Sequence, residues 1–362
     1  MQTNFMRIII VTQTFPPKIG GMQSVMKSLA EELSSYFQIV VLPNNYVKKE
    51  CLNKGLNKIK IKYFYIPKIF KPLIKKIYLF FFSTKEDVFI CDSWKSIAAI
   101  PKKFNKSIYV LAHGQEYLNA KKNDSIKNAL VRVSAVISNS FFTKKLSSKF
   151  LISDIKNYVI PPTYMLPNTV IKKKFSLIKS INFITISRIE ERKGLLQSIS
   201  ALSEIHKKYP TLKFKWNIIG IGPQLPLLKE YVKKSNLNQI IKFHGIVNDT
   251  FKNNLLRNSH VFVMPSYKIN NSVEGFGIVY AEALRYGIPS VAGIDGGVTD
   301  VIKNNENGWN INPLNILKLQ ELFLWVINHP NEINKLGKQS QIIYLKKFTK
   351  NNSINKLLKI IH

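Results

Sequence analysis

Short apolar runs alternate with amphipathic stretches along the first 160 residues of the chain. Between the first two runs, Val25, Leu29 and Leu33 recur at helical spacing, which predicts a helix over residues 22–35. The runs themselves do not alternate with polar residues, as is typical of strands in a parallel sheet covered on both faces. The predicted strands are residues 7–11, 37–42, 87–91, 107–112, 135–138 and 157–160.

The pattern breaks at Pro161-Pro162, and a polar, lysine-rich connection runs to about residue 180 before it starts again. A helix is then predicted over residues 194–209, and residues 315–362 are mostly helical in pattern. The strands predicted in this second part are residues 181–186, 214–219, 240–243, 261–264 and 289–292.

Two successive sets of strands and helices predict an α/β protein of two Rossmann-like, doubly wound domains that face each other across a cleft. We place the first domain at residues 1–165 and the second at residues 166–345. We expect a C-terminal helix at about residues 346–362, which can pack back on the first domain.

Length and composition are those of an ordinary globular protein, with 362 residues of which 45% are hydrophobic. No apolar run reaches the roughly 18–20 residues that a membrane-spanning helix needs. Residues 1–11 lead into a strand pattern and do not resemble a signal peptide, so we expect a cytoplasmic protein. Cys51 and Cys91 show no metal-ligand spacing, which favours reduced, structural thiols.

The net charge is +33, from 54 basic and 21 acidic residues. It is spread evenly, because residues 1–165 hold 26 basic and 9 acidic residues (+17) and residues 166–362 hold 28 and 12 (+16). Such a charge admits nucleic acid, an anionic membrane or an anionic substrate as partner, and it equally fits a coding bias toward Lys, Asn and Ile. Since no zinc-finger, RNA-recognition or helix-turn-helix signature is present, we expect no nucleic-acid partner.

The most informative stretch of the chain is residues 272–283. Glu274 lies in a loop broken by glycines, and Glu282, eight positions later, lies in a predicted helix. A helix start offers free N–H groups and the positive end of the helix dipole, which suit a phosphate. Carboxylates on either side suit hydroxyl-rich groups. The combination indicates a sugar nucleotide as ligand.

Two motifs in the first domain directly follow predicted strands. Gly20-Gly21 comes after Pro16-Pro17, and paired glycines let a backbone approach a ligand closely. His113 follows strand 107–112, where it either contacts a sugar and shields developing charge or is a structural histidine. An ordinary turn is the alternative for the glycines, but the carboxyl ends of strands are where such sheets bind ligands.

Two further motifs follow strands of the second domain. Arg188 and Lys193 are suited to neutralise a diphosphate together, although a solvated turn of mixed charge is an equal alternative. Gly220-Ile221-Gly222 resembles half of a dinucleotide fingerprint, but Leu225 occupies the third glycine position, which argues against NAD. This glycine pair fits a tight turn near a base or ribose.

Taken in order, these motifs resemble those of the retaining glycosyltransferases of family 4, which have the two-Rossmann GT-B fold. The likeness covers nearly the whole chain and departs from the family at Ile160-Pro161-Pro162-Thr163, where Pro-Asn-Gly is usual. The motifs that carry it are Gly20-Gly21, His113-Gly114, Ser187-Arg188 to Lys193-Gly194, Gly220 to Pro223, Glu274 to Glu282, Gly296-Gly297 with Asp300-Val301, and Asn307-Gly308.

The resemblance implies a role for each matching residue. Glu274 would contact the transferred sugar and stabilise positive charge near its anomeric carbon, and His113 would lie near the same sugar; these two are the catalytic residues that we expect. Glu282 would hold the ribose hydroxyls of the donor, and Arg188 and Lys193 would hold its diphosphate. The remaining donor-binding positions are Gly20, Gly21, Gly222, Phe276, Gly277 and Ile278.

The resemblance also implies the reaction, a hexosyl transfer with retention from a UDP- or GDP-linked sugar to a hydroxyl of a glycan or lipid-linked acceptor. The first domain would bind the acceptor and the second the donor, without a cofactor or metal ion, in the synthesis of bacterial lipopolysaccharide, capsule or another surface polysaccharide. A nucleotide-sugar epimerase or phosphorylase on the same scaffold remains the alternative enzyme. A lectin-like module without activity and a basic nucleic-acid-binding protein are the non-enzyme alternatives.

The densest basic patch is residues 53–82, with eight lysines and no acidic residue. Within it, residues 69–80 predict a basic amphipathic helix that would lie on the anionic inner face of the cytoplasmic membrane through Lys71, Lys75 and Lys76. A surface helix with an ordinary core face is the alternative.

Overall fold

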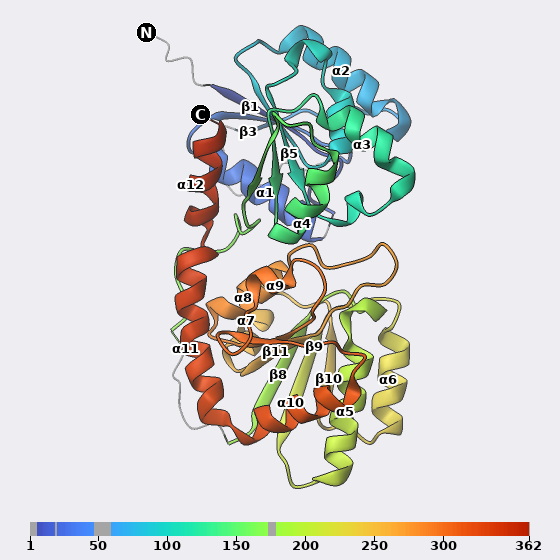
Figure 1. Ribbon diagram of the computed structural model, residues 1–362, viewed down its shortest axis with the longest axis vertical. Coiled ribbons are helices and arrows are strands. Elements are labelled where there is room, and N and C mark those ends of the chain that lie inside the picture. Colours follow the sequence, from blue (N-terminus) through green and yellow to red (C-terminus); the bar gives the residue numbers. More distant parts are fainter. Residues whose placement is uncertain (1–5, 19, 47–58, 173–178, 362) are drawn as a thin grey trace. The chain divides into compact units, whose positions relative to one another are not determined.

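The computed structural model describes residues 6–18, 20–46, 59–172 and 179–361. The chain divides into two compact units (Figure 1). Unit 1 comprises Met1–Leu166 and Lys350–His362, and unit 2 comprises Pro167–Thr349. In the part of the chain that is described, no helix is both long and apolar enough to cross a membrane.

Unit 1 is built on a seven-stranded parallel sheet in the order β3-β2-β1-β4-β5-β6-β7. The chain runs outward from β1 to β3 and then returns to the other side of β1 with β4. Ligands of doubly wound sheets bind at the carboxyl ends of the strands beside such a switch point. The strands are β1 (Arg7–Val11), β2 (Gln38–Leu42), β3 (Ile59–Ile61), β4 (Val88–Cys91), β5 (Ile108–Ala112), β6 (Ala135–Ser138) and β7 (Lys156–Val159).

Helices cover both faces of this sheet, with α2 and α3 on one side and α1 and α12 on the other (Figure 1). On the α2 side the core joins strand residues such as Ile9 and Phe89 to Leu79 of α2. The α-helices described in unit 1 are α1 (Gly21–Leu33), α2 (Lys71–Phe82), α3 (Asn123–Leu130), α4 (Phe141–Ser147) and α12 (Lys350–Ile361). The short 3-10 helix η2 (Lys68–Phe70) directly precedes α2, and η3 (Trp94–Ala99) follows β4.

The C-terminal helix α12 is tied to unit 1 by polar and apolar contacts. The Lys350 ammonium donates to the Glu32 carboxylate of α1 at 2.8 Å, and the hydroxyls of Thr163 and Ser353 lie 2.7 Å apart. Ile354 and Leu357 are buried. The last residues of the chain thus complete the unit that the first residues begin.

Unit 2 holds a six-stranded parallel sheet in the order β10-β9-β8-β11-β12-β13, with its switch point between β8 and β11. Phe183, Trp216 and Phe323 are central to its core. The strands are β8 (Ile181–Ile186), β9 (Phe214–Ile219), β10 (Ile241–Gly245), β11 (Val261–Met264), β12 (Ser290–Ala292) and β13 (Gly308–Asn310). The helices are α5 (Leu195–Lys208), α6 (Leu225–Lys234), α7 (Asp249–Arg257), α8 (Ile278–Arg285), α9 (Val298–Val301), α10 (Ile316–Asn328) and α11 (Pro330–Lys347), with the 3-10 turn η8 (Glu191–Lys193).

Two Rossmann-like parallel sheets confirm the predicted fold class. Strands β1, β6, β8, β9 and β11 have the predicted bounds, and the other predicted strands differ by one or two residues. Two strands at sheet edges, β3 and β13, were not predicted, because each has only three residues.

Candidate active site

Glu274 lies in the loop between β11 and α8, where two cations hold its carboxylate. The Lys193 ammonium donates to Glu274 Oε2 at 2.6 Å, and Arg192 Nη1 donates to the same oxygen at 3.1 Å. Both cations belong to η8, directly after β8, which is the neighbour of β11 in the sheet. Among the described residues, none hydrogen-bonds to Oε1, so this oxygen remains available to a ligand.

The charges of this cluster keep Glu274 ionised. Burial alone would raise the pKa of Glu274, but the nearby Lys193 and Arg192 outweigh it and lower that pKa below its ordinary value. The side chain keeps 18% of its surface exposed, whereas each cation keeps 8%. The carboxylate is therefore a fixed negative charge with one oxygen committed to the protein.

A glycine pair braces the backbone of Glu274 from behind. The Gly297 N–H donates to the Glu274 carbonyl at 2.8 Å. Gly296 has φ +83°, and a Cβ there would lie 2.2 Å from that carbonyl oxygen, so only glycine fits. The brace holds the loop in place just before α8 begins.

Phe276, Gly277 and Ile278 form the junction between the Glu274 loop and α8, where N–H groups were predicted to meet a phosphate. Gly277 caps the helix with φ +82°, and no side chain caps it. The first N–H groups of a helix have no partner within the helix. The Phe276 side chain is buried. Since none of these three residues has a side-chain donor, only the backbone N–H groups of this junction can donate to a ligand.

The two arginines after β8 differ in their surroundings. Arg188, predicted to hold a diphosphate with Lys193, keeps 74% of its side chain exposed and pairs with Glu190 at 2.8 Å. Glu190 also approaches Arg192 Nε at 3.3 Å, so it links the exposed arginine to the buried one. The sequence interpretation did not single out Arg192, although it lies next to Lys193 and contacts Glu274.

Glu282, predicted to bind ribose, lies on α8 and pairs with a lysine of α7. Lys252 Nζ lies 2.9 Å from Glu282 Oε1 and 3.2 Å from Asp249 Oδ1. Burial would lower the pKa of Lys252, but the Glu282 and Asp249 carboxylates raise it overall. A ribose hydroxyl that binds Glu282 would therefore share the carboxylate with Lys252, which sequence reasoning did not identify.

Gly222 serves the packing of two loops that follow neighbouring strands. Ile189 N–H donates to the Ile221 carbonyl at 2.9 Å, and Gln224 N–H donates to the Ile189 carbonyl at 3.1 Å. A Cβ at Gly222 would lie 2.4 Å from that Ile189 oxygen. Close approach of the two backbones explains this glycine without a ligand, and its predicted donor contact stays a prediction.

In unit 1, Gly20 and Gly21 open α1 directly after the loop that follows β1. Gly20 is the N-cap residue and Gly21 is the first residue of the helix. A Cβ at Gly21 would meet no atom within 4 Å, whereas one at Gly20 would meet the flexible Gln23 side chain. The backbone at Gly21 is therefore open to a ligand.

His113 follows β5 and is fixed by three hydrogen bonds. Its Nε2 lies 2.9 Å from the Asp92 carbonyl, and because a carbonyl only accepts, Nε2 carries the proton. The His113 N–H donates to Glu116 at 2.6 Å, and the Asn139 amide donates to the His113 carbonyl at 3.2 Å. This tautomer leaves Nδ1 as an acceptor on a well-oriented ring.

The predicted membrane-facing role of Lys71 and Lys75 is wrong. Both side chains are buried, with 3% and 2% exposure, and of the three lysines only Lys76 is exposed. Lys75 Nζ donates to the Leu42 carbonyl and to Asn44 Oδ1, each at 2.6 Å, and Lys71 Nζ donates to the Asn44 carbonyl at 2.5 Å. Carbonyl acceptors at the end of β2 and in the loop after it bind these two lysines, so α2 is amphipathic with Lys71 and Lys75 on its protein-facing side.

The outward face of α2 and η2 is apolar. Ile69 has 80% and Phe81 73% of its surface exposed. The other exposed apolar residues of this face are Phe70, Leu73, Ile77, Phe80 and Phe82. Residues 53–58 of the lysine-rich patch lie outside the described residues.

Of the two cysteines, Cys91 at the end of β4 is a free, buried thiol, and Cys51 lies outside the described residues. Burial raises the pKa of the Cys91 thiol well above its ordinary value. This agrees with a structural thiol at position 91.

Residues 169–343 match the family described as glycosyl transferases group 1. This second part of the chain is similar to the group 1 glycosyltransferases. A protein of Salmonella typhimurium named for colanic acid biosynthesis, WcaL, is 27% identical over 130 residues, which cover 36% of this chain and 32% of WcaL. The match thus spans about a third of the length of the first curated relatives. An uncharacterized glycosyltransferase of Methanocaldococcus jannaschii is 24% identical over 349 residues, covering 86% of each chain.

A solved structure has a similar fold over both units of the chain. HepE from Anabaena, in complex with UDP, matches with a TM-score of 0.76 and 16% identity, covering 98% of this chain and 99% of HepE. At this identity the match supports the GT-B fold over the whole chain.

Proposed function

We propose that this chain is a retaining glycosyltransferase of family 4 that moves a sugar from a nucleotide-sugar donor to a hydroxyl of a glycan or lipid-linked acceptor. The observation that carries the proposal is the Glu274 carboxylate, which Lys193 and Arg192 hold through one oxygen beside the start of α8. A free carboxylate oxygen, two cations and a helix N-terminus in one place suit a sugar next to a diphosphate.

The proposed reaction breaks the bond between the anomeric carbon and the diphosphate oxygen. Positive charge then develops on the sugar, where the Glu274 carboxylate stabilises it. Negative charge develops on the leaving diphosphate, and Lys193, Arg192 and the α8 N-terminus neutralise it. The acceptor oxygen attacks the same face of the sugar, and its proton passes to the departing phosphate.

The names of the similar proteins support the substrate class and the setting. WcaL is named for colanic acid biosynthesis, a further relative from Erwinia amylovora for amylovoran biosynthesis, and HepE was solved with UDP. We infer a UDP- or GDP-linked donor and a role in the synthesis of a bacterial surface polysaccharide or lipopolysaccharide.

The test is to screen UDP- and GDP-linked sugars for binding by thermal shift and then to measure nucleotide release with and without acceptors. Release that requires an acceptor, with an α-linked product from an α-linked donor by NMR, supports the proposal. An epimerised donor without acceptor would indicate an epimerase, and sugar phosphate formed with inorganic phosphate would indicate a phosphorylase. Because cations neutralise the diphosphate, we expect EDTA to leave the rate unchanged within about twofold.

We further propose that the protein binds the inner face of the cytoplasmic membrane through the apolar face of α2 and η2, with Lys76 and Lys68 at its border. Apolar residues at the surface of a basic protein suit an anionic leaflet. The measurement is sedimentation with liposomes, in which Leu73→Ser/Phe81→Ser should abolish binding while Lys145→Ser/Lys149→Ser, on exposed positions of the same unit, should not. Equal sedimentation of both variants would contradict this mode of binding.

A further inference from the structure

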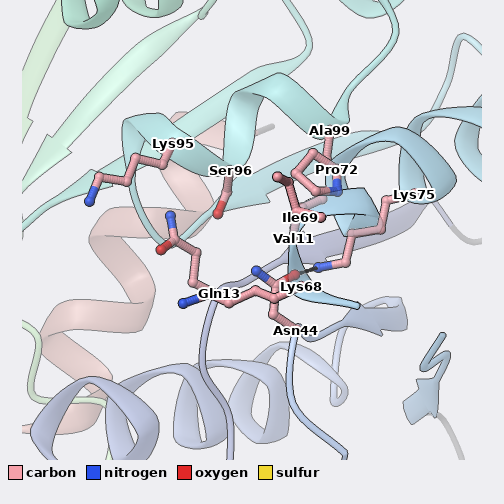
Figure 2. A pocket seen from close by; sticks show the side chains of 10 residues that line it. All are labelled: Val11, Gln13, Asn44, Lys68, Ile69, Pro72, Lys75, Lys95, Ser96 and Ala99. Atoms are coloured by element: carbon pink, nitrogen blue, oxygen red, sulfur yellow. Dashed lines mark hydrogen bonds between the residues drawn. The ribbon is translucent and has the colours of Figure 1, made fainter. Parts of the chain in front are cut away.

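Unit 1 contains a pocket of about 470 Å³ that the roles assigned above do not use (Figure 2). It lies at the carboxyl ends of β1, β2 and β4, beside the switch point of the sheet, where doubly wound folds bind ligands. Its volume is in the range of small-molecule sites. The lining residues are Val11, Gln13, Asn44, Lys68, Ile69, Pro72, Lys75, Lys95, Ser96 and Ala99.

Three of the lining side chains are lysines, and none is a carboxylate. Lys68 and Lys95 are exposed and form no ion pair among the described residues. Lys75 is buried and directs its ammonium to Asn44, as Figure 2 shows. The rest of the wall combines apolar side chains with the neutral polar groups of Gln13, Asn44 and Ser96.

Among the described residues, the positive charge around the pocket exceeds the negative charge. Lys71, next to Lys75 on the same helix face, also lacks a carboxylate partner among the described residues and is bound by Asn44 and Tyr63. The nearby carboxylate is Asp92, which is buried and accepts hydrogen bonds from Thr12, Gln13 and Ser96. The described residues in and beside the pocket thus include four lysines and one carboxylate.

Neutral carbonyl groups hold the buried lysines in place but do not neutralise them. Lys75 Nζ has acceptors at 2.6 Å from Leu42 and Asn44 and at 3.3 Å from Thr12, so its ammonium has no donor left for a ligand. Because burial lowers the pKa of Lys75 to about 7, only the protonated fraction of this side chain adds positive charge to the pocket near neutral pH. Direct contacts with an anion fall to Lys68 and Lys95, which lie at the pocket surface.

We propose that this pocket binds the phosphate or diphosphate group of a lipid-linked acceptor. The group would supply the missing negative charge, and the lipid would follow the apolar face of α2 and η2, which begins at Ile69 in the pocket wall. The acceptor role rests on the proposed function, whereas the anion site rests on the lysines alone.

The test is isothermal titration of the full chain with geranyl diphosphate, inorganic pyrophosphate and geraniol. Lys68→Gln/Lys95→Gln should weaken geranyl diphosphate binding at least about tenfold, because two charged contacts are lost. Lys145→Gln/Lys149→Gln, which removes the same charge from exposed positions of unit 1, should change it less than about twofold. We expect pyrophosphate to bind the unsubstituted chain more weakly than geranyl diphosphate, and geraniol not to bind.

Unchanged binding by the Lys68/Lys95 variant would overturn the proposal, as would equal losses in the two double variants. A Lys193→Gln variant that loses geranyl diphosphate binding would place the anion in unit 2 and also overturn it. Equal affinity for pyrophosphate would overturn the lipid part. A failure of this anion site can be told apart from a failure of the proposed function, since a chain without transferase activity can still bind geranyl diphosphate through Lys68 and Lys95.

Discussion

Among the described residues, each unit buries two cationic side chains near the carboxyl ends of its strands, but the two units bind them through different acceptors. In unit 2, Arg192 and Lys193 share the Glu274 carboxylate. In unit 1, Lys71 and Lys75 bind oxygens that carry no net charge. The ionic cluster fixes a carboxylate in a defined place, whereas the cluster with neutral acceptors keeps an excess of positive charge. The arrangement in unit 2 suits catalysis at a fixed carboxylate, and the arrangement in unit 1 suits recognition of an anion.

The largest expected effect comes from breaking the ionic cluster. Glu274→Ala should lower kcat by about 10³-fold, since it removes the charge that stabilises the reacting sugar. The nucleotide Kd should stay within about threefold, because Lys193 and Arg192 remain. Steady-state kinetics and nucleotide titration measure the two effects. Equal losses in kcat and nucleotide binding would contradict the assigned role.

Gly296→Ala tests the brace behind the same carboxylate. A Cβ 2.2 Å from the Glu274 carbonyl forces the loop to move, so we expect about 2–3 kcal/mol of lost stability and a fall in kcat. Thermal unfolding and kinetics of the variant check this. Gly245→Ala serves as control, because it also has positive φ but meets no atom within 4 Å. Wild-type kinetics in the Gly296 variant would show that the brace is dispensable.

Lys75→Met tests the cluster that is held by neutral acceptors. Removal of the ammonium leaves Asn44 Oδ1 without its lysine donor and takes one of two donors from the Leu42 carbonyl, which also accepts from the Thr12 N–H, so unit 1 should lose about 2 kcal/mol of stability. Lys76→Met, one position along and exposed, should change stability by less than about 0.5 kcal/mol. Urea unfolding compares the two variants. Similar losses would mean that the buried contacts contribute little.

The pH dependence of stability should separate the two clusters. Burial lowers the pKa of Lys75 from 10.5 to about 7, so between these values the unfolded chain binds more protons and stability rises with pH. The pKa of Glu274 is lowered from 4.5, so its contribution is present above that value and is lost as pH falls through the folded-state pKa.

Urea unfolding at a series of pH values tests both directions. The stability of the wild type relative to Lys75→Met should grow from about pH 7 to about pH 9.5. The stability of the wild type relative to Glu274→Gln should shrink below about pH 4.5. A difference that stays constant over either window would contradict the charge state assigned to that side chain.

The smallest expected effect is that of Gly21→Ala in unit 1. A Cβ there meets nothing within 4 Å, and alanine favours a helix over glycine, so stability should rise by at most about 1 kcal/mol. If a ligand approaches this backbone, KM should increase while the fold is unaffected. Unchanged kinetics would favour an ordinary turn at Gly20-Gly21.

Periodicity and apolar runs were sufficient to predict the fold, because strands such as β6 and β11 are buried along their whole length. They failed for β3, where a lysine stands between two isoleucines in a three-residue edge strand. Such a strand is defined by its pairing with β2, which no local pattern encodes.

A site residue could be predicted from the sequence only where its role follows from its immediate neighbours in the chain. Glu274 lies before a helix start, as its glycines indicated. The partners of Glu274 could not be chosen, because Arg188 and Arg192 lie four residues apart and only the fold buries one of them. The prediction for the lysines of α2 failed for a similar reason, since the carbonyl groups that accept their hydrogen bonds come from the end of β2 and the loop after it.

Because α12 packs on unit 1, it affects the order in which the two units can fold during synthesis. Unit 2 is one continuous segment, whereas unit 1 needs the last residues of the chain to cover its core. Domains fold as units during synthesis, so unit 2 is expected to reach its native fold while unit 1, begun first, still lacks Ile354 and Leu357. Unit 1 can therefore be complete only after all of unit 2 has been synthesised.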